Sequence, residues 1–212
     1  MTSRAVLFDF DGTLADSAPD LAAVLDAMRA ARELDPLSID TVRPYASSGA
    51  RGLLRIGFGL TPASPEYLAM REEFLSLYEK NVCVRTRLFP GIRELLAQLR
   101  VPWGIVTNKA HRFTDRLVPS LQLKPACVVC GDSTPHLKPH PAMLLLAAQR
   151  LNFSCKEISY VGDDLRDVQA ARAAGMRAVA VEYGYHGTDH GGPRTWNADA
   201  VISHPEELLE HL

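Results

Sequence analysis

Short, nearly continuous apolar runs recur along the chain. They cover residues 5–8, 103–107, 126–130, 158–161, 178–181 and 200–202. Runs of this length, without the alternation of a half-exposed strand, are typical of strands buried on both faces of a parallel sheet. Segments with helical periodicity lie between most of them, among them residues 92–100, 142–151 and 165–174. This alternation predicts an α/β fold built on a doubly wound parallel sheet.

The interval between the first two predicted strands is too long for one crossover helix. About ninety residues separate Phe10 from Trp103, and apolar side chains recur there at helical spacing, first at Leu21, Val24, Leu25 and Met28 and later at Tyr67, Met70, Phe74 and Tyr78. Glycines around residues 47–52 and 57–59 predict loops between helices, which places Arg51 in a glycine-flanked loop. We therefore predict a core of residues 1–15 and 86–212 and an inserted helical domain of residues 16–85.

Composition and charge narrow the range of partners. The chain has 212 residues, 47% of them hydrophobic, with 23 basic against 25 acidic side chains and a net charge of −2. No cluster of lysine and arginine is present to bind nucleic acid or an anionic membrane, and the longest apolar run, residues 142–148, is too short to span a bilayer. The start of the chain lacks the pattern of a signal peptide. We expect a cytoplasmic protein, a monomer or a homodimer, that binds a small molecule.

The cysteines are too few and too scattered for a disulfide scaffold. Cys127 and Cys130 have CxxC spacing, but they fall in a predicted strand, where residues three apart point to opposite faces. We therefore predict that both are buried and that the pair does not close a metal or redox site.

A second possible metal-binding segment lies beyond the fifth predicted strand. His186, Asp189 and His190 are side chains that could hold a transition metal. No helical frame positions them, and the surrounding sequence is rich in glycine. We favour a flexible loop over a second metal site.

Two carboxylates follow directly on the first predicted strand. Asp9 and Asp11, in the motif DFDGT, would lie at the carboxyl end of a parallel strand, where α/β sheets place ligands. Close together they repel each other, and a hard cation such as Mg²⁺ relieves that repulsion. Taken alone, the motif also fits a turn of the Asx type.

Polar side chains also follow the next two predicted strands. Thr107 and Asn108 come after the second strand, where a hydroxyl and nearby backbone amides could hold a phosphoryl oxygen. Lys138, directly before Pro139, lies beyond the third strand. A cation there would neutralise a nucleophilic carboxylate and the phosphoryl charge, although a lone lysine is usually solvated.

The fourth predicted strand ends in the acidic sequence GDDLRD, which opens a helix. Its carboxylates could be helix caps. Asp163 could also reach the same metal as Asp9, and Asp164 is the alternative ligand. Asp167, one helical turn later, could orient Lys138 or a metal-bound water without itself binding the metal.

The ordered set DFDGT, VTN, LKP and GDDLRD resembles the four motifs of the haloacid-dehalogenase (HAD) superfamily. The motifs span residues 9–167, and the helical insertion matches the small cap domain of that superfamily. LFPG at residues 88–91 and WNAD at residues 196–199 are similar to the phosphoglycolate phosphatase branch. The resemblance implies a Rossmann-like core and Mg²⁺-dependent hydrolysis of a phosphate monoester through an aspartyl-phosphate.

The resemblance also implies roles for individual residues. Asp9 would be the nucleophile and Asp11 the general acid and base. Mg²⁺ would be held by Asp9, Asp163 and the backbone carbonyl of Asp11, while Thr107 and Lys138 would complete the electrostatic cradle. Because the dehalogenases of the superfamily lack an aspartate at the position of Asp11, dehalogenation is disfavoured.

The sequence constrains the reaction more tightly than it constrains the substrate. The resemblance suggests 2-phosphoglycolate or a related carboxylate-bearing ester, whose carboxylate Arg51 could bind with its planar guanidinium. N-acetylmuramic acid 6-phosphate and other sugar phosphates are alternatives, and a phosphomutase would use the same aspartates. From a different class, a phospho-acceptor signalling module has a similar set of side chains, but it is about half this length and carries its acceptor on a middle strand.

Overall fold

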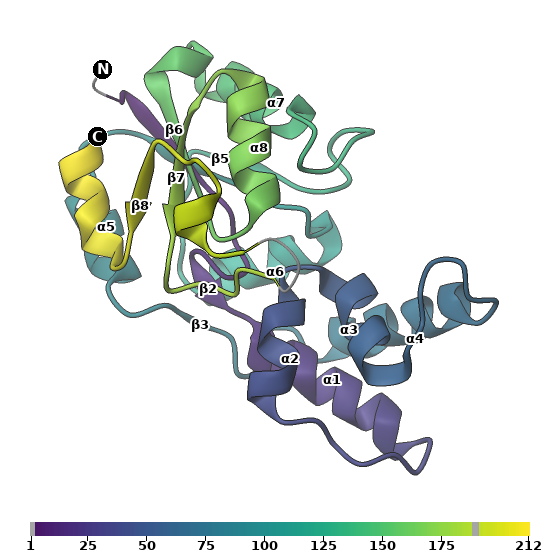
Figure 1. Ribbon diagram of the computed structural model, residues 1–212. Coiled ribbons are helices and arrows are strands. Elements are labelled where there is room, and N and C mark those ends of the chain that lie inside the picture. The colour runs from purple at the N-terminus through teal and green to yellow at the C-terminus, as the bar shows by residue number, and fades with distance from the viewer. Residues whose placement is uncertain (1–2, 188–190) are drawn as a thin grey trace.

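The computed structural model describes residues 3–187 and 191–212. Within them, six strands form one parallel sheet in the order β5-β4-β1-β6-β7-β8 (Figure 1). The strands are β1 Ala5–Phe8, β4 Trp103–Val106, β5 Cys127–Val129, β6 Ile158–Gly162, β7 Arg177–Val181 and β8 Ala200–Ile202. The prediction of a doubly wound parallel sheet is therefore confirmed, and each apolar run forms one strand.

Strand order determines where the functional side chains can meet. β1 is central and pairs in parallel with β4 on one side and β6 on the other. The chain builds outward from β1 to β4 and β5, then crosses back to β6 and continues to β7 and β8. The direction of winding thus reverses beside β1, and in open α/β sheets the crevice at such a point holds the ligand.

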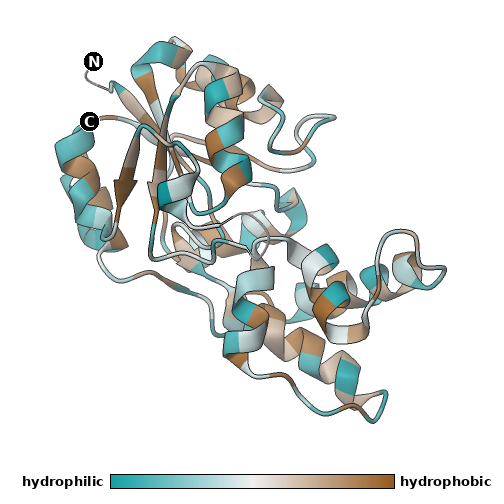
Figure 2. Cartoon of the chain, viewed as in Figure 1, coloured by the Kyte–Doolittle hydropathy of each residue, from teal (hydrophilic) through white to brown (hydrophobic). Residues whose placement is uncertain are grey.

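Helices cover both faces of the sheet. One face carries α5 (Ile92–Gln98), α6 (His111–Ser120) and the final 3₁₀ helix η3 (Pro205–His211), and the other carries α7 (Ala142–Leu151) and α8 (Leu165–Ala174). In β1, Val6 and Phe8 belong to the first apolar layer, and Ala5 and Leu7 belong to the second. Both faces of the strand are therefore dry, which explains why its sequence is continuously apolar. Figure 2 shows hydrophobic positions along the sheet and hydrophilic positions alternating with them on the covering helices.

The long insertion forms a separate helical layer beside the carboxyl ends of the strands (Figure 1). Its helices are α1 (Ala18–Ala30), α2 (Ile39–Ala46), α3 (Gly49–Phe58) and α4 (Tyr67–Lys80). Where the chain enters and leaves it, β2 (Ala15–Asp16) and β3 (Arg87–Leu88) pair as an antiparallel ribbon. The division at residues 15/16 and 85/86 into two domains remains our proposal. Two short 3₁₀ helices, η1 (Cys155–Glu157) and η2 (Pro193–Thr195), complete the elements.

One local prediction was wrong. Residues 49–52 form the first turn of α3, so Arg51 lies on a helix and not in a loop. The glycines were misleading because glycine usually weakens a helix. At Gly52, however, an added Cβ would lie only 2.6 Å from the carbonyl oxygen of Tyr45, so glycine is needed there for the close approach of α2 and α3.

Two further observations concern the cysteines and the hydropathy of the helices. Cys127 and Cys130 are both buried, as predicted, and no disulfide forms among the described residues. Across residues 3–187 and 191–212, no helix has both the length and the apolar character that crossing a bilayer requires.

Candidate active site

The carboxyl ends of β1, β4 and β6 bring the predicted polar residues together. Asp9 follows β1, Thr107 follows β4 and Asp163 follows β6, while Lys138 arrives from the segment after β5. A cavity of about 670 Å³ opens between this edge of the sheet and the helical layer. Of the residues singled out in the sequence, its lining includes Asp9, Asp11, Arg51, Thr107, Asn108, Lys138, Asp164 and Asp167.

Lys138 lies at the centre of a cluster of charged side chains. Its Nζ lies 2.8 Å from Asp9 Oδ1 and 2.8 Å from Asp167 Oδ1, and its side chain is only 2% exposed. Nζ also lies 2.7 Å from the hydroxyl of Tyr160. Burial on its own would lower the pKa of Lys138, but the carboxylates of Asp167 and Asp9 raise that pKa above its ordinary value. The ammonium group therefore stays charged between the two carboxylates.

Negative charge exceeds positive charge in this buried cluster. Oxygens of Asp9, Asp163 and Asp167 lie within 4.8 Å of one another, and Lys138 forms ion pairs with Asp9 and Asp167. Burial raises the pKa of Asp9 to about 7 against the opposing attraction of Lys138. Burial, followed by the charges of Asp9 and Asp167, raises the pKa of Asp163 well above its ordinary value. A divalent cation with a preference for oxygen would relieve this repulsion.

Asp163 is held by polar groups from three distant segments. Thr13 donates its hydroxyl to Oδ1 at 2.9 Å, and the amide of Tyr185 donates to Oδ2 at 3.0 Å. The hydroxyl of Ser47, from the turn between α2 and α3, donates to Oδ2 at 3.2 Å. Gly12 makes this packing possible, because its φ is +85° and an added Cβ would lie 2.1 Å from Asp163 Oδ2.

The two neighbouring aspartates of the GDD sequence point in different directions. Asp163 faces Asp9, whereas Asp164 caps the first turn of α8 by accepting the backbone amide of Arg166 at 2.9 Å. The guanidinium of Arg166 lies 2.8 Å from the same carboxylate. Arg166 also donates to the carbonyl of Ser47 at 2.8 Å. Asp164 therefore links the core to the helical layer through Arg166.

Asp11 lies where the core meets α4. It accepts a hydrogen bond from the hydroxyl of Ser17, and Lys109 Nζ lies 3.1 Å from its Oδ2. Lys109 Nζ also donates to the hydroxyl of Tyr78, on α4, at 3.3 Å. The sequence analysis assigned no role to Lys109; its position directly after VTN was the available signal.

Thr107 and Asn108 organise the loop after β4. Thr107 is 2% exposed, and its hydroxyl accepts the amide of Lys109 at 3.2 Å. The side chain of Asn108 accepts the amide of Lys138 at 2.9 Å and donates to the Lys138 carbonyl at 3.3 Å. Asn108 therefore fixes the backbone that presents Lys138.

The cavity lining also combines exposed arginines with buried aromatic rings. Arg51 on α3 and Arg71 on α4 are exposed and line the cavity, and neither forms an ion pair with a residue that the structure describes. The aromatic residues of the lining are Tyr67, Phe74, Tyr78 and Phe113. Sequence reasoning missed Arg71, since helical spacing alone does not distinguish a cavity-facing arginine from a solvated one.

The histidine segment after β7 is described only in part. The ring Nε2 of His186 lies 3.1 Å from the carbonyl oxygen of Val181, and the ring is near Trp196. Asp189 and His190 lie outside the described residues. The preference for a loop over a second metal site remains a hypothesis.

Comparison with known proteins agrees with this geometry. A family model described as haloacid dehalogenase-like hydrolase matches residues 6–181. An N-acetylmuramic acid 6-phosphate phosphatase from Pseudomonas aeruginosa is 42% identical, over 100% of this chain and 96% of its own length. A phosphoglycolate phosphatase from Xanthomonas campestris is 41% identical, over 98% of this chain and 95% of its own.

Solved structures show the same architecture. The crystal structure of a predicted phosphoglycolate phosphatase from Haemophilus somnus is similar, with a TM-score of 0.86 and 25% identity over 100% of this chain and 98% of that one. The family match, the two phosphatase relatives and the convergence of all four motifs on one cavity lead to the same conclusion. The protein belongs to the haloacid dehalogenase-like hydrolases and is a phosphatase of that family.

Proposed function

We propose that the protein is a Mg²⁺-dependent phosphatase that hydrolyses a small phosphate ester bearing a carboxylate, such as 2-phosphoglycolate, through an aspartyl-phosphate. The observation that carries the proposal is the geometry around Lys138, which lies 2.8 Å from Asp9 and 2.8 Å from Asp167 in the lining of the cavity. The carboxylate of Asp9, the nucleophile, thus lies beside the fixed positive charge of Lys138, in a cavity that a phosphoryl group can enter.

Asp9 and Asp11 divide the reaction into two displacements. In the first, a carboxylate oxygen of Asp9 forms a bond to phosphorus, the bond from phosphorus to the ester oxygen breaks, and Asp11 donates a proton to that oxygen. In the second, a water oxygen bonds to phosphorus, the bond to Asp9 breaks, and Asp11 accepts the proton of the water. Lys138 and Thr107 stabilise the charge on the phosphoryl oxygens.

The acidic cluster fits a magnesium ion. Three buried or half-buried carboxylates lie within 4.8 Å of one another, and Mg²⁺ prefers such oxygen ligands. Asp9, Asp163 and the backbone carbonyl of Asp11 would hold the ion, with Asp167 orienting Lys138 beside it. When bound, the ion supplies positive charge that stabilises the transferring phosphoryl group.

The cavity supports a substrate with a second anionic group. Arg51 and Arg71 extend from two different helices at its rim and could bind a carboxylate with bidentate geometry. A volume of about 670 Å³ is in the usual range for small-molecule sites and exceeds what a two-carbon ester fills. That volume favours, as a second candidate, a phosphorylated sugar acid such as N-acetylmuramic acid 6-phosphate.

The test is a substrate panel at saturating Mg²⁺. We would measure kcat/KM for phosphate release from 2-phosphoglycolate, N-acetylmuramic acid 6-phosphate, hexose 6-phosphates and β-glucose 1-phosphate, with Asp9→Asn as the blank. A preference of about 100-fold, near 2.7 kcal/mol of transition-state discrimination, would identify the substrate. Isomerised sugar without phosphate release would indicate a phosphomutase, and no turnover of any ester would refute the proposal.

Two companion experiments test the cation and the carboxylate. Chelation should abolish phosphate release, and Mg²⁺ should restore it. Arg51→Ala combined with Arg71→Ala should lower kcat/KM about 10- to 100-fold for carboxylate-bearing esters, because charged hydrogen bonds are lost. The kcat/KM for sugar phosphates without a carboxylate should stay unchanged. Arg172→Ala, on the exposed side of α8, is the control. Unchanged selectivity in the double variant would remove the carboxylate from the proposal.

A further inference from the structure

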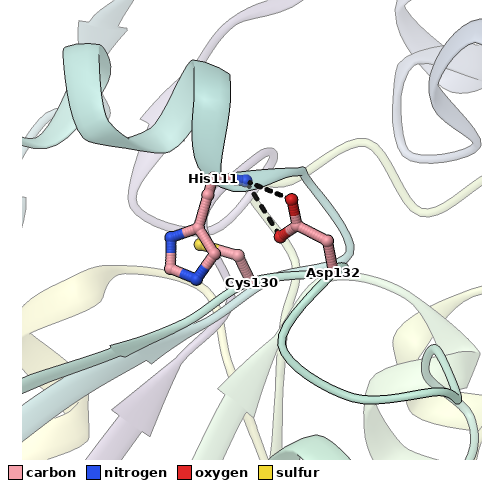
Figure 3. Close-up of side chains that lie close together, drawn as sticks. All are labelled: His111, Cys130 and Asp132. Carbon is pink, nitrogen blue, oxygen red and sulfur yellow. Dashed lines mark hydrogen bonds between the residues drawn. The ribbon is translucent and has the colours of Figure 1, made fainter.

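A second cluster of metal-ligating side chains lies outside the catalytic cavity. His111 begins α6, and Cys130 and Asp132 belong to the turn that follows β5 (Figure 3). One ligand atom of each lies within 4.8 Å of the others. Cys130 is fully buried, the side chain of His111 is 42% exposed, and Asp132 is exposed. None of the three lines the catalytic cavity, so the active site does not account for this cluster.

Hydrogen bonds donated by three backbone amides hold the cluster in place. The amide of Ser133 donates to the carbonyl of Cys130 at 2.9 Å, and the Cys130 amide donates to the hydroxyl oxygen of Ser133 at 2.9 Å. The carboxylate of Asp132 accepts the backbone amide of His111 at 3.0 Å, which ties the turn to the start of α6 (Figure 3). Three potential ligands thus come from a closed turn and a helix end that are locked together.

The imidazole of His111 has the surroundings of a metal ligand. Its Nδ1 lies 3.5 Å from Asp115 Oδ1, one helical turn later, and its Nε2 lies 3.0 Å from Ser133 Oγ in the turn. Metal-binding histidines usually donate their other ring N–H to a carboxylate, which fixes the ring and the tautomer. Asp115, whose side chain is 70% exposed, can approach Nδ1 by a small rotation, and Nε2 already faces Ser133 in the turn that holds Cys130.

We propose that Cys130 Sγ, His111 Nε2 and a carboxylate oxygen of Asp132 form a Zn²⁺ site. Sulfur, imidazole nitrogen and carboxylate oxygen are the ligands that zinc prefers, and tetrahedral zinc leaves a fourth position for Ser133 Oγ or a water. Ligand atoms around tetrahedral zinc lie roughly 3.5 Å apart, so small side-chain rotations suffice to close the cluster. The thiol releases its proton to solvent when the sulfur–zinc bond forms, and the thiolate and carboxylate together balance the charge of the ion.

The proposed site adjoins the loop that carries Asn108 and Lys109. The amide of Gly131, inside the turn, donates to the carbonyl of Lys109 at 2.9 Å. An added Cβ at Gly131 would lie 2.3 Å from the carbonyl oxygen of Asn108, so the two segments are in tight contact. A bound ion would therefore stabilise the turn against which the active-site loop packs, and we expect it to raise the melting temperature.

The test uses protein without a histidine tag, stripped of metal and then held in excess Mg²⁺ to occupy the catalytic carboxylates. Titration with Co²⁺ should produce a near-ultraviolet charge-transfer band, which requires a sulfur ligand, at one ion per chain. Zn²⁺ should remove the band, and its affinity follows from competition with a chromogenic chelator. Cys130→Ser and His111→Gln should abolish the band, and Asp115→Asn should weaken zinc binding about 10-fold.

Controls separate this site from surface binding. Cys127→Ser changes a buried cysteine of β5, outside the cluster, and should leave the band and the affinity unchanged. His136 and His140 lie close to each other, with ring centroids 4.3 Å apart, and could bind zinc weakly. Absence of the band in the wild type would overturn the proposal. So would zinc binding that survives Cys130→Ser and His111→Gln but disappears in His140→Ala, because the protein would then hold an adventitious ion only.

Discussion

Lys109 and Asp11 form a half-buried ion pair, with 3.1 Å between Nζ and Oδ2, at the junction of the core and α4. The ammonium group also lies 4.7 Å from the ring centroid of Tyr78, on α4. Although burial opposes it, the charge of Asp11 raises the pKa of Lys109 above its ordinary value. The residue to which we assign proton transfer is thus positioned by a lysine that also contacts the helical layer.

Replacing Lys109 tests this positioning role. Lys109→Met keeps the length of the side chain but removes the charge, and we expect kcat to fall at least about 10-fold, with KM changing less. The kcat of Asp11→Asn should fall further, about 10²- to 10⁴-fold, as is typical when a general acid is lost. Tyr78→Phe removes only a 3.3 Å hydrogen bond and should change kcat little. If kcat in Lys109→Met matches the wild type, Ser17 alone holds Asp11.

Removal of Lys138 should destabilise the fold as well as stop turnover. Its charge lies between Asp9 and Asp167, and removing one partner of a buried ion pair costs about 3–5 kcal/mol. We expect Lys138→Met to lower the free energy of unfolding by this amount, measured by urea denaturation in the presence of chelator. Lys138→Met combined with Asp167→Asn should recover part of the loss, since one unpaired carboxylate is gone. A double variant no more stable than the single one would contradict this account.

Gly12 is needed for close packing at the site. Its φ is +85°, and a Cβ there would lie 2.1 Å from Asp163 Oδ2. We expect Gly12→Ala to abolish phosphatase activity and to weaken Mg²⁺ binding, because Asp163 must move. Gly175→Ala is the matched control: its φ is +73°, but nothing lies within 4 Å of an added Cβ. It should cost only the backbone strain of about 1–2 kcal/mol and retain activity. Equal activity in the two variants would show that packing against Asp163 is unimportant.

The thiols should differ in reactivity. Burial raises the pKa of Cys127 to about 11. Since the raised pKa lowers the thiolate fraction, that fraction at pH 8 is on the order of 10⁻³, and alkylation should be slow until the pH approaches 11. Cys155, which is partly exposed, should react first; mass spectrometry of iodoacetamide-treated protein would give the order. Rapid modification of Cys127 at pH 8 would indicate that β5 opens readily.

The sequence was sufficient for the parts of the fold that depend on local pattern. Residues 142–151 and 165–174 form helices with the predicted bounds, because their periodicity and end signals agree. The parallel sheet followed from continuous apolar runs, since strands covered on both faces need no polar positions. DFDGT, VTN and GDDLRD could be located for the same reason, since each lies at the end of such a run, whereas LKP lies several residues beyond the third run.

Contacts between distant segments could not be read from the sequence in this way. The sequence analysis placed Arg51 in a loop, because glycines usually weaken a helix. At Gly52, however, the backbone of Tyr45 lies so close that no side chain fits, and glycine is required within the helix. The different directions of Asp163 and Asp164 depend on Arg166 and on the cap of α8. No periodicity distinguishes two adjacent aspartates.

The sequence by itself determined the fold class, the family resemblance and the set of residues at the carboxyl ends of the strands. Only the tertiary structure decided that Lys138 lies between Asp9 and Asp167, that Lys109 pairs with Asp11, and that His111 lies beside Cys130 and Asp132. The physical reason is that hydrophobic periodicity depends on neighbours along the chain, whereas ion pairs and ligand clusters depend on where the packed sheet and helices place charges far apart in sequence.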